Sequence, residues 1–468
     1  MGKFSKIGFI LATLGSSIGL GHIWRFPYMA GQMGGGAFVL LFLLLAFFIG
    51  VSLLVADMLI GNKGKRDVVG CFEALDPSPR KLWRLSGFVI IGGPIILSFY
   101  AVILGWILYY LLAVSFALPS DMPSSQAIFE ALMSERIFYQ ILGFAACLFI
   151  TALIVSFGIK DGIERLNLVL MPLLFVLFIG LLIYAAFQPS FMQAVHFLFD
   201  FKYQDLTPSV LMSALAQMFF SLSLGVGTII TYAAASQEKQ NLFKSALWVV
   251  IPGIAISLIA GLIIFTFFFG YSGEAKNLSD NGAKLVFISL PLIFSEFGAV
   301  GQILSVAFLS ALLFAGITST VSLLEPSVYY LTQRRGFNRI GATFGVSVVV
   351  FALGLLALYS MSLPYGAKLS VGGESAFFWL DFVSSSIIMP IGALISVVFV
   401  GFIIGKERLK DYTKDFFSPI AFGVWLFILR YIAPIVIIGI LAYKILADTL
   451  FAIAGILVYK IMEIMGVL

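Results

Sequence analysis

Eleven long apolar runs, each bounded by charged residues or by Gly, Pro and Asn, dominate the sequence. They lie at 7–30, 35–60, 85–115, 137–158, 163–187, 209–235, 243–272, 300–333, 338–360, 376–404 and 419–446. A helix needs about 20 apolar residues to cross the hydrocarbon core of a bilayer. We therefore predict an all-α integral membrane protein with about eleven transmembrane helices. The stretch 449–468 is also apolar, but Lys460 and Glu463 interrupt it, so it is predicted to be either a twelfth span or an interfacial helix.

The positive charges indicate how these spans are oriented. If the N-terminus is cytoplasmic, twenty Lys and Arg residues fall in cytoplasmic segments and six fall in outer loops. Cytoplasmic loops of membrane proteins carry an excess of Lys and Arg. The sequence thus predicts a multi-pass protein of the cell (cytoplasmic) membrane with a cytoplasmic N-terminus.

Composition excludes several other classes of protein. Hydrophobic residues make up 61% of the chain and charged residues 11%, against roughly 45–50% and 25% in soluble domains. The two cysteines, Cys71 and Cys147, rule out a disulfide framework, a cysteine-based zinc site and an iron–sulfur cluster. With only two histidines, His22 and His196, metal catalysis is not expected either. The net charge of +5 is assigned to membrane anchoring, and no nucleic-acid partner is expected.

Two of the apolar runs contain the same interruption near their midpoints. Ser17-Ile-Gly-Leu-Gly21 lies in the first run and Ser223-Leu-Gly-Val-Gly227 in the sixth, although Gly costs about 1 kcal/mol relative to Ala inside a helix. Because five spans separate the breaks, the two halves would have opposite topologies, as in secondary transporters built from inverted repeats. We predict a first repeat over 1–190, a second over 205–405, and an eleventh span with the tail over 415–468. The alternative is an ordinary helix-packing face of the GxxxG kind, which has a different glycine spacing.

The segment GSSIGLGHIWRFPYMAGQMGGGAF at 15–38 closely resembles the signature of the neurotransmitter:sodium symporter family. Further similar segments are FFSLSLGVGTIITYA (219–233), GIERLNLVLMP (162–172), FAGITSTVSLLEP (314–326) and FWLDF (378–382). The resemblance extends along the whole chain and is to the bacterial amino-acid branch. It implies a 5+5 inverted-repeat, leucine-transporter-like fold in which the first and sixth helices are broken.

A broken helix offers both kinds of group that a zwitterionic amino acid needs. Backbone N–H groups from Leu20 to Gly21 would bind a carboxylate, and carbonyls freed near Ser17, Phe220 and Ser221 would accept from an ammonium group. The resemblance adds the hydroxyl of Tyr100 as a carboxylate ligand, although a lone Tyr in an apolar helix is more often a packing residue. It also implies a side-chain pocket lined by Ile96, Tyr100, Phe220, Ser223, Val226, Ser319 and Leu323. No charge lies on these walls, so a hydrophobic or aromatic substrate is predicted.

For sodium, the resemblance implies one intact site and one altered site. The intact site would use the carbonyl oxygens of Gly15, Ile18 and Ala315 with the hydroxyls of Thr318 and Ser319. The other site uses two asparagines in the family, and here those positions are His22 and Gly253, which argues against a second ion. Histidine titrates near neutral pH, so His22 is a possible proton site. A neutral His22 that hydrogen-bonds to the backbone is the alternative.

Chloride is not expected to be needed. In chloride-dependent relatives a tyrosine, a glutamine and hydroxyls hold the anion, whereas this chain has Phe42 at the tyrosine position beside Gln217, Ser221 and Ser257.

Charged residues within the spans point to gates. Such residues are rare in membranes and usually functional or paired. By resemblance Arg25 and Asp381 form an outer gate that closes over the occupied site; a plain structural ion pair is the alternative. The family's cytoplasmic gate is altered, because Lys3 stands at a tryptophan position and Gln333 at an aspartate position. A different inner closure is therefore predicted.

Taken together, these residues predict a sodium-coupled secondary active symporter that imports hydrophobic or aromatic amino acids by alternating access. A proton-coupled or exchange-type carrier using His22 and a non-transporting amino-acid sensor are the alternatives. No enzyme is expected, because no Ser/His/Asp set, metal cluster or phosphate loop is present. The expected partners are a small-molecule amino acid and the lipid bilayer, and the oligomeric state stays open.

Overall fold

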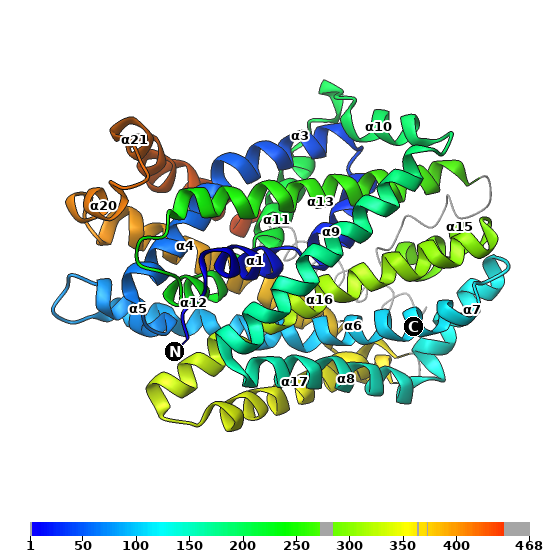
Figure 1. Cartoon of the computed structure of the whole chain (residues 1–468), viewed down its shortest axis with the longest axis horizontal. Helices are drawn as coiled ribbons and strands as arrows, with labels where there is room; N and C mark the ends of the chain where they lie inside the picture. The colour runs from blue at the N-terminus through cyan, green and yellow to red at the C-terminus, as the bar shows by residue number, and fades with distance from the viewer. Residues whose placement is uncertain (1, 272–283, 363–364, 372, 444–468) are drawn as a thin grey trace, which may run out of the picture.

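The computed structural model describes residues 2–271, 284–362, 365–371 and 373–443, and helices make up nearly all of them (Figure 1). In these residues, nine helices are long and apolar enough to cross a membrane, or ten if a helix pair bent by 50° counts as one span. The nine are Gly36–Gly64, Leu82–Phe116, Ile137–Ser156, Ile159–Ala186, Leu242–Gly270, Gly298–Arg335, Arg339–Met361, Ala376–Ile403 and Pro419–Tyr443. The predicted all-helical membrane fold is confirmed. The predicted stretch 449–468 lies outside the described residues.

The bent pair is the first predicted span. Helix α1 (Lys6–Ser17) begins where the Ser5 hydroxyl accepts a hydrogen bond from Gly8 N, and it ends at Ile18, whose backbone is extended. The chain becomes helical again in η1 (Gly21–Arg25) and α2 (Phe26–Gln32). The predicted break at 17–21 is therefore present.

The sixth predicted span is also broken. Helix α11 (Pro208–Ser221) and helix α12 (Thr228–Ala234) are separated by a non-helical stretch in which Ser223, Gly225 and Gly227 have positive φ angles. Glycine adopts this backbone region without steric cost. A side chain at Gly225 would also come within 2.0 Å of the Met389 carbonyl oxygen. Neither half is long enough to cross a membrane alone, which is why this run is absent from the nine long helices.

The remaining elements complete the bundle around these two breaks. Within the long spans they are α3 (Gly36–Leu45), η2 (Ala46–Gly50), α4 (Val51–Gly64), η3 (Leu82–Ile91), α6 (Gly92–Phe116), α8 (Ile137–Ser156), η4 (Ile159–Glu164), α9 (Arg165–Ala186), α13 (Leu242–Gly270), α16 (Gly298–Arg335), α17 (Arg339–Met361), α18 (Ala376–Asp381), η9 (Phe382–Ile388), α19 (Met389–Val398), η10 (Phe399–Ile403), α21 (Pro419–Phe427) and η11 (Ile428–Ile432). Helix α6 packs against α16, α8 and α17, whereas α1 packs against α13, α16 and α9.

Short elements connect the spans at the two ends of the bundle, and apolar periodicity does not predict them. They are α5 (Val68–Leu75), α7 (Met122–Ser134), α10 (Phe191–Phe199), η5 (Tyr203–Asp205), η7 (Leu285–Ser289), α15 (Leu290–Ser295), η8 (Gly366–Leu369), α20 (Lys406–Thr413) and the antiparallel pair β1 (Ser370–Val371) and β2 (Glu374–Ser375). The N-terminus, α5 and α20 lie at one end of the bundle, and α7 and α15 lie at the other (Figure 1).

Large apolar side chains cover the outside of the bundle. Phe149 on α8, Ile183 on α9 and Trp248 on α13 are each more than half exposed. Contiguous apolar surface of this kind is rare on soluble monomers and marks contact with a membrane or a partner. The multi-pass membrane assignment accounts for it.

Candidate functional site

A cavity lies where the two helix breaks meet. The residues that line it are Ser16, Ser17, Gly19, Gly21, Ile96, Tyr100, Phe220, Ser223, Val226, Ser319, Leu323 and Met389. The structure thus brings together nine of the eleven residues predicted to bind substrate. Leu20 contributes through its backbone, and the Ser221 hydroxyl points elsewhere, donating to the Met218 carbonyl oxygen at 3.0 Å.

Three lining residues were not predicted from the sequence. Ser16 and Gly19 lie inside the Ser-x-Gly-x-Gly break and its flank, so the break itself was the available signal. Met389 starts α19 after the π-helical segment η9. Nothing local in the sequence distinguishes this methionine from a packing residue.

Hydrogen bonds tie the polar wall of the cavity to both breaks. The Tyr100 hydroxyl accepts a hydrogen bond from Leu20 N at 3.0 Å. The Ser223 hydroxyl donates to the Ser16 carbonyl oxygen at 2.8 Å, joining the sixth-span break to the first. The Ser17 hydroxyl is buried without a hydrogen-bond partner. Hydroxyl and backbone groups are therefore available where a carboxylate and an ammonium group would sit.

Two glycines allow the close packing around this wall. A side chain at Gly19 would come within 2.5 Å of Ser319 Oγ and 2.7 Å of Tyr100 Oη. At Gly21 it would come within 2.7 Å of the Phe220 ring. Any larger residue would push these groups out of the cavity wall.

The rest of the lining is apolar. Ile96, Val226 and Leu323 are buried, and no charged side chain lines the cavity among the described residues. Arg25 lies over the lining residue Phe220, with its guanidinium carbon 4.6 Å from the centroid of the ring. This is a cation–π contact. Asp381 interacts with Arg25 electrostatically, but these two described residues form no direct ion pair.

The residues predicted to bind sodium lie on α1, its break and α16, two helices that pack together. The Ser319 hydroxyl donates to the Gly15 carbonyl oxygen at 3.3 Å, and the Thr318 hydroxyl donates to the Ala315 carbonyl oxygen at 3.0 Å. Ile18 caps α1, and its carbonyl lies at the start of the break. All five residues are buried. Backbone carbonyls at the end of a half-helix, together with hydroxyls, are ligands that suit Na+.

His22 and Gly253 lie side by side on the opposite flank of the first-span break. The imidazole is buried, and its Nδ1 lies 2.7 Å from Ser257 Oγ. Its Nε2 has no hydrogen-bond partner. A side chain at Gly253 would come within 3.1 Å of this Nε2. The two departures from the family pattern thus form a matched pair, in which the absence of a side chain at 253 leaves room for the imidazole.

The residues expected at a chloride site make other contacts. The Gln217 amide donates to the Gly21 carbonyl oxygen at 2.7 Å, and Ser257 contacts His22. Phe42 packs on Phe26 with ring centroids 5.1 Å apart. Gln217 therefore binds the backbone at the first-span break, and Ser257 binds the His22 imidazole.

Phe4 packs the N-terminal segment against α12 and the residue that follows it. Phe4 is buried, its ring packs edge-on against Tyr232 at 5.5 Å, and its backbone N donates to the Ala235 carbonyl oxygen at 3.0 Å. The next residue, Ser5, donates through its hydroxyl to Glu164 Oε1 at 2.5 Å. By contrast, Lys3 is exposed and its Nζ lies 3.7 Å from Glu238 Oε1. At this end of the bundle, a buried aromatic contact therefore lies next to Lys3, the predicted gate position.

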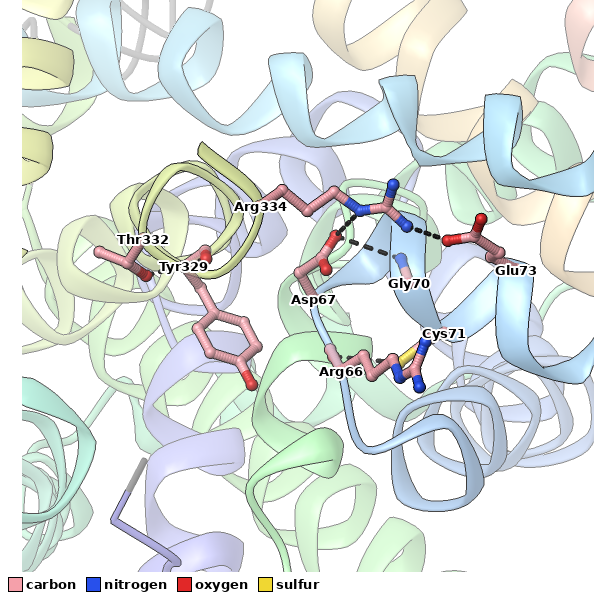
Figure 2. A network of polar contacts seen from close by, with 8 residues as sticks. All are labelled: Arg66, Asp67, Gly70, Cys71, Glu73, Tyr329, Thr332 and Arg334. Atoms are coloured by element: carbon pink, nitrogen blue, oxygen red, sulfur yellow. Dashed lines mark hydrogen bonds and ion pairs between the residues drawn. The ribbon is translucent and has the colours of Figure 1, made fainter. Parts of the chain in front are cut away.

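An ion-pair cluster at the same end joins α16 to α5 (Figure 2). Arg334 Nε lies 3.4 Å from Asp67 Oδ1, and the same guanidinium binds Glu73. Asp67 also accepts a hydrogen bond from Gly70 N at 3.1 Å and so caps α5. The arginine in this cluster, Arg334, directly follows Gln333, which stands at the position of the family's aspartate.

Glu325 and Asp57 are two further buried carboxylates, and both are held by neighbours. Glu325 pairs with Arg339 at 2.5 Å, and Asp57 lies against the Ser396 hydroxyl and the Gly225 backbone. In the described part of the chain, no group of three or more His, Cys, Asp or Glu side chains could hold a metal ion.

Comparison with known proteins identifies relatives along nearly the whole chain. Residues 3–131 and 138–456 match the Sodium:neurotransmitter symporter family. The uncharacterized sodium-dependent transporter YhdH of Bacillus subtilis (strain 168) is 35% identical over 442 residues, which covers 93% of this chain and 95% of that protein. An uncharacterized sodium-dependent transporter of Haemophilus influenzae is 29% identical over 93% of this chain and 96% of its own length.

A solved structure shares the fold. The crystal structure of MhsT in complex with L-phenylalanine superimposes with a TM-score of 0.85 and 34% sequence identity, and the match covers 94% of this chain and 99% of that chain.

Proposed function

Because the chain belongs to the sodium:neurotransmitter symporter family, we propose that it is a sodium-coupled secondary active symporter that imports hydrophobic or aromatic amino acids by alternating access. The observation that carries this proposal is the uncharged cavity at the meeting point of two broken helices. The phenylalanine bound in the related MhsT structure supports the choice of substrate class.

The substrate would bind with its charged ends on the helix breaks. Its carboxylate takes hydrogen bonds from the Tyr100 hydroxyl and from backbone N–H groups at Leu20 and Gly21. Its ammonium group donates to oxygen atoms near Ser17 and Phe220. The side chain lies against Ile96, Val226 and Leu323, with Ser221, Ser223 and Ser319 around it.

One sodium ion would be carried with each substrate molecule. It binds the carbonyls of Gly15, Ile18 and Ala315 and the hydroxyls of Thr318 and Ser319. The other family position is filled by His22 beside Gly253, and chloride is not required. Arg25 and Asp381 form the outer gate, closing further when substrate is bound.

The two halves of the chain, 1–190 and 205–405, act as inverted repeats, with 415–468 outside them. The protein lies in the cell membrane with its N-terminus in the cytoplasm.

Proton coupling through His22 is the second candidate. The buried Nε2 without a partner is the observation that favours it, since imidazole exchanges protons near neutral pH. Uptake that is insensitive to pH between about 5.5 and 8 and unchanged in His22→Asn would exclude it.

Uptake into proteoliposomes tests the main proposal. Labelled leucine, phenylalanine, tryptophan, alanine and lysine are supplied under an inward sodium gradient, with choline as the control cation and at two pH values. Accumulation of the large apolar substrates only with sodium is expected. Accumulation driven by a pH gradient in choline would move the coupling to His22, and binding without accumulation would indicate a sensor.

A further inference from the structure

Asn167 is a buried amide whose carbonyl oxygen has no hydrogen-bond partner. It lies on α9, it is fully buried, and its Nδ2 donates to the Ile163 carbonyl oxygen at 2.8 Å. Its Oδ1 accepts nothing. Leaving a buried acceptor unpaired costs about 1–3 kcal/mol. Such a group calls for a ligand that donates to it or coordinates it.

This oxygen faces the sodium site. A methyl group placed on Gly15 would lie 2.0 Å from Asn167 Oδ1 and 3.2 Å from Thr318 Cβ. Gly15 and Thr318 are two of the five proposed sodium ligands, and they come from α1 and α16. Helix α9 packs against both of these helices. The unpaired oxygen therefore lies where the ligands from α1 and α16 meet.

The hydrogen bond to Ile163 fixes the direction of the amide. Turning the amide over would place Oδ1 against the Ile163 carbonyl oxygen, where two acceptors would face each other without a proton. The amide nitrogen is thus held by its own helix, and the oxygen is left pointing at Gly15.

We propose that Asn167 Oδ1 is an additional ligand for the transported sodium ion. This inference rests on the proposed sodium site and adds a third helix to it. A side-chain oxygen from α9 completes the shell that the carbonyls and hydroxyls of α1 and α16 leave open. Removing it should weaken sodium binding directly, without altering the cavity that receives the amino acid, since Asn167 does not line that cavity.

Sodium binding to the purified full-length protein tests this role. Radioactive sodium is titrated in detergent at pH 8, and thermal unfolding is followed in sodium and in choline. For Asn167→Leu, which keeps the volume and removes the amide, the half-saturating sodium concentration should rise about tenfold or more. Unfolding in choline should occur at the same or a higher temperature than in the wild type, because an unpaired buried oxygen has been removed.

Two further variants make the result specific. Asn167→Asp keeps the oxygen and adds charge next to the cation, so its half-saturating concentration should fall below the wild-type value. Gln140→Met removes another buried amide, which binds Trp106 and the Leu132 carbonyl; it should leave sodium binding unchanged.

Half-saturation within about twofold of the wild type in Asn167→Leu would overturn the proposal, since an ordered water would then satisfy the oxygen. Equal weakening in Asn167→Asp and Asn167→Leu would overturn it too. A wild-type protein that binds no sodium would instead contradict the proposed symport itself.

Discussion

The two flanks of the first-span break carry different polar groups. On the flank facing α16, carbonyls and hydroxyls lie close together, with donors directed only at other oxygens. On the flank facing α13, the His22 imidazole fits against Gly253 and contacts Ser257. If this flank binds no ion, as we propose, the comparison teaches that an ion site can be replaced without leaving a hole, because the His22 side chain fills the space beside Gly253.

The largest effect is expected on the α16 flank. Thr318→Val keeps the shape of the side chain and removes a hydroxyl that, in our proposal, binds sodium. Hydrogen bonds and contacts to charged groups contribute about 1.5–3 kcal/mol, so the half-saturating sodium concentration should rise about 10–100-fold. Sodium titration of uptake in proteoliposomes measures it.

The matched control for this variant lies two residues away. Thr320 is also fully buried on α16, but its hydroxyl contacts Thr151 at 2.7 Å, away from the break. Thr320→Val should leave the sodium dependence unchanged. Equal losses in the two variants would mean that α16 is merely sensitive to substitution and that the flank is not an ion site.

The next largest effect concerns the group between the two flanks. Tyr100→Phe removes the hydroxyl that binds Leu20 N and, in our proposal, the substrate carboxylate. The substrate concentration for half-maximal uptake should rise about tenfold or more, since a hydrogen bond to a charged group is lost. Competition with labelled phenylalanine measures it.

Tyr110 is the control for Tyr100. It lies on the same helix α6 and is buried, but its hydroxyl has no hydrogen-bond partner. Tyr110→Phe should therefore transport normally. A Tyr100→Phe protein with unchanged substrate affinity would place the carboxylate elsewhere.

A smaller effect is expected on the selection of substrates by size, which does not involve either flank. Val226 is buried in the cavity wall next to Gly92, and Val226→Phe adds a ring to that wall. Pocket discrimination by small changes in volume is worth about 1–3 kcal/mol, so tryptophan uptake should fall about tenfold relative to leucine. Val226→Leu should give an intermediate ratio, and sodium half-saturation should stay the same in both. Equal transport of alanine and tryptophan by the wild type would contradict the size argument.

How much of this could be read from the sequence depends on whether the signal is local. The breaks were predictable because each Ser-x-Gly-x-Gly segment places two glycines, which disfavour a helix, in the middle of an apolar run. Ser17, Gly21 and Phe220 in the lining followed from the breaks themselves, whereas the other predicted lining residues followed only from the family resemblance. His22 and Gly253 lie on different helices far apart in the sequence, so single-sequence patterns could not show that these two residues pack against each other.

The missed elements show the same limit. Phe4 sits in a basic N-terminal segment, where an aromatic residue gives no sign of being buried against Tyr232. Asn167 stands inside a recognised motif, yet its role depends on which of its two polar atoms is left unpaired. Both depend on packing between distant helices, which periodicity does not encode.

The smallest effect in transport, and the sharpest test of the comparison, comes from placing asparagines at positions 22 and 253, as the family resemblance implies for a second sodium site. Gly253→Asn alone should unfold at a lower temperature, because even its Cβ would lie 3.1 Å from His22 Nε2 and the rest of the side chain would need the space of the ring. Adding His22→Asn removes the ring, so the double variant should recover the lost stability. It would also place two amide oxygens where the family uses them.

The sodium dependence of uptake in the double variant should then change from a Hill coefficient of about 1 to about 2, with the maximal rate changed less than about fivefold. If the double variant recovers stability but keeps a Hill coefficient near 1, the two asparagines are not sufficient to create a second sodium site on this flank. A single Gly253→Asn variant as stable as the wild type would show that the imidazole and the glycine are not a matched pair.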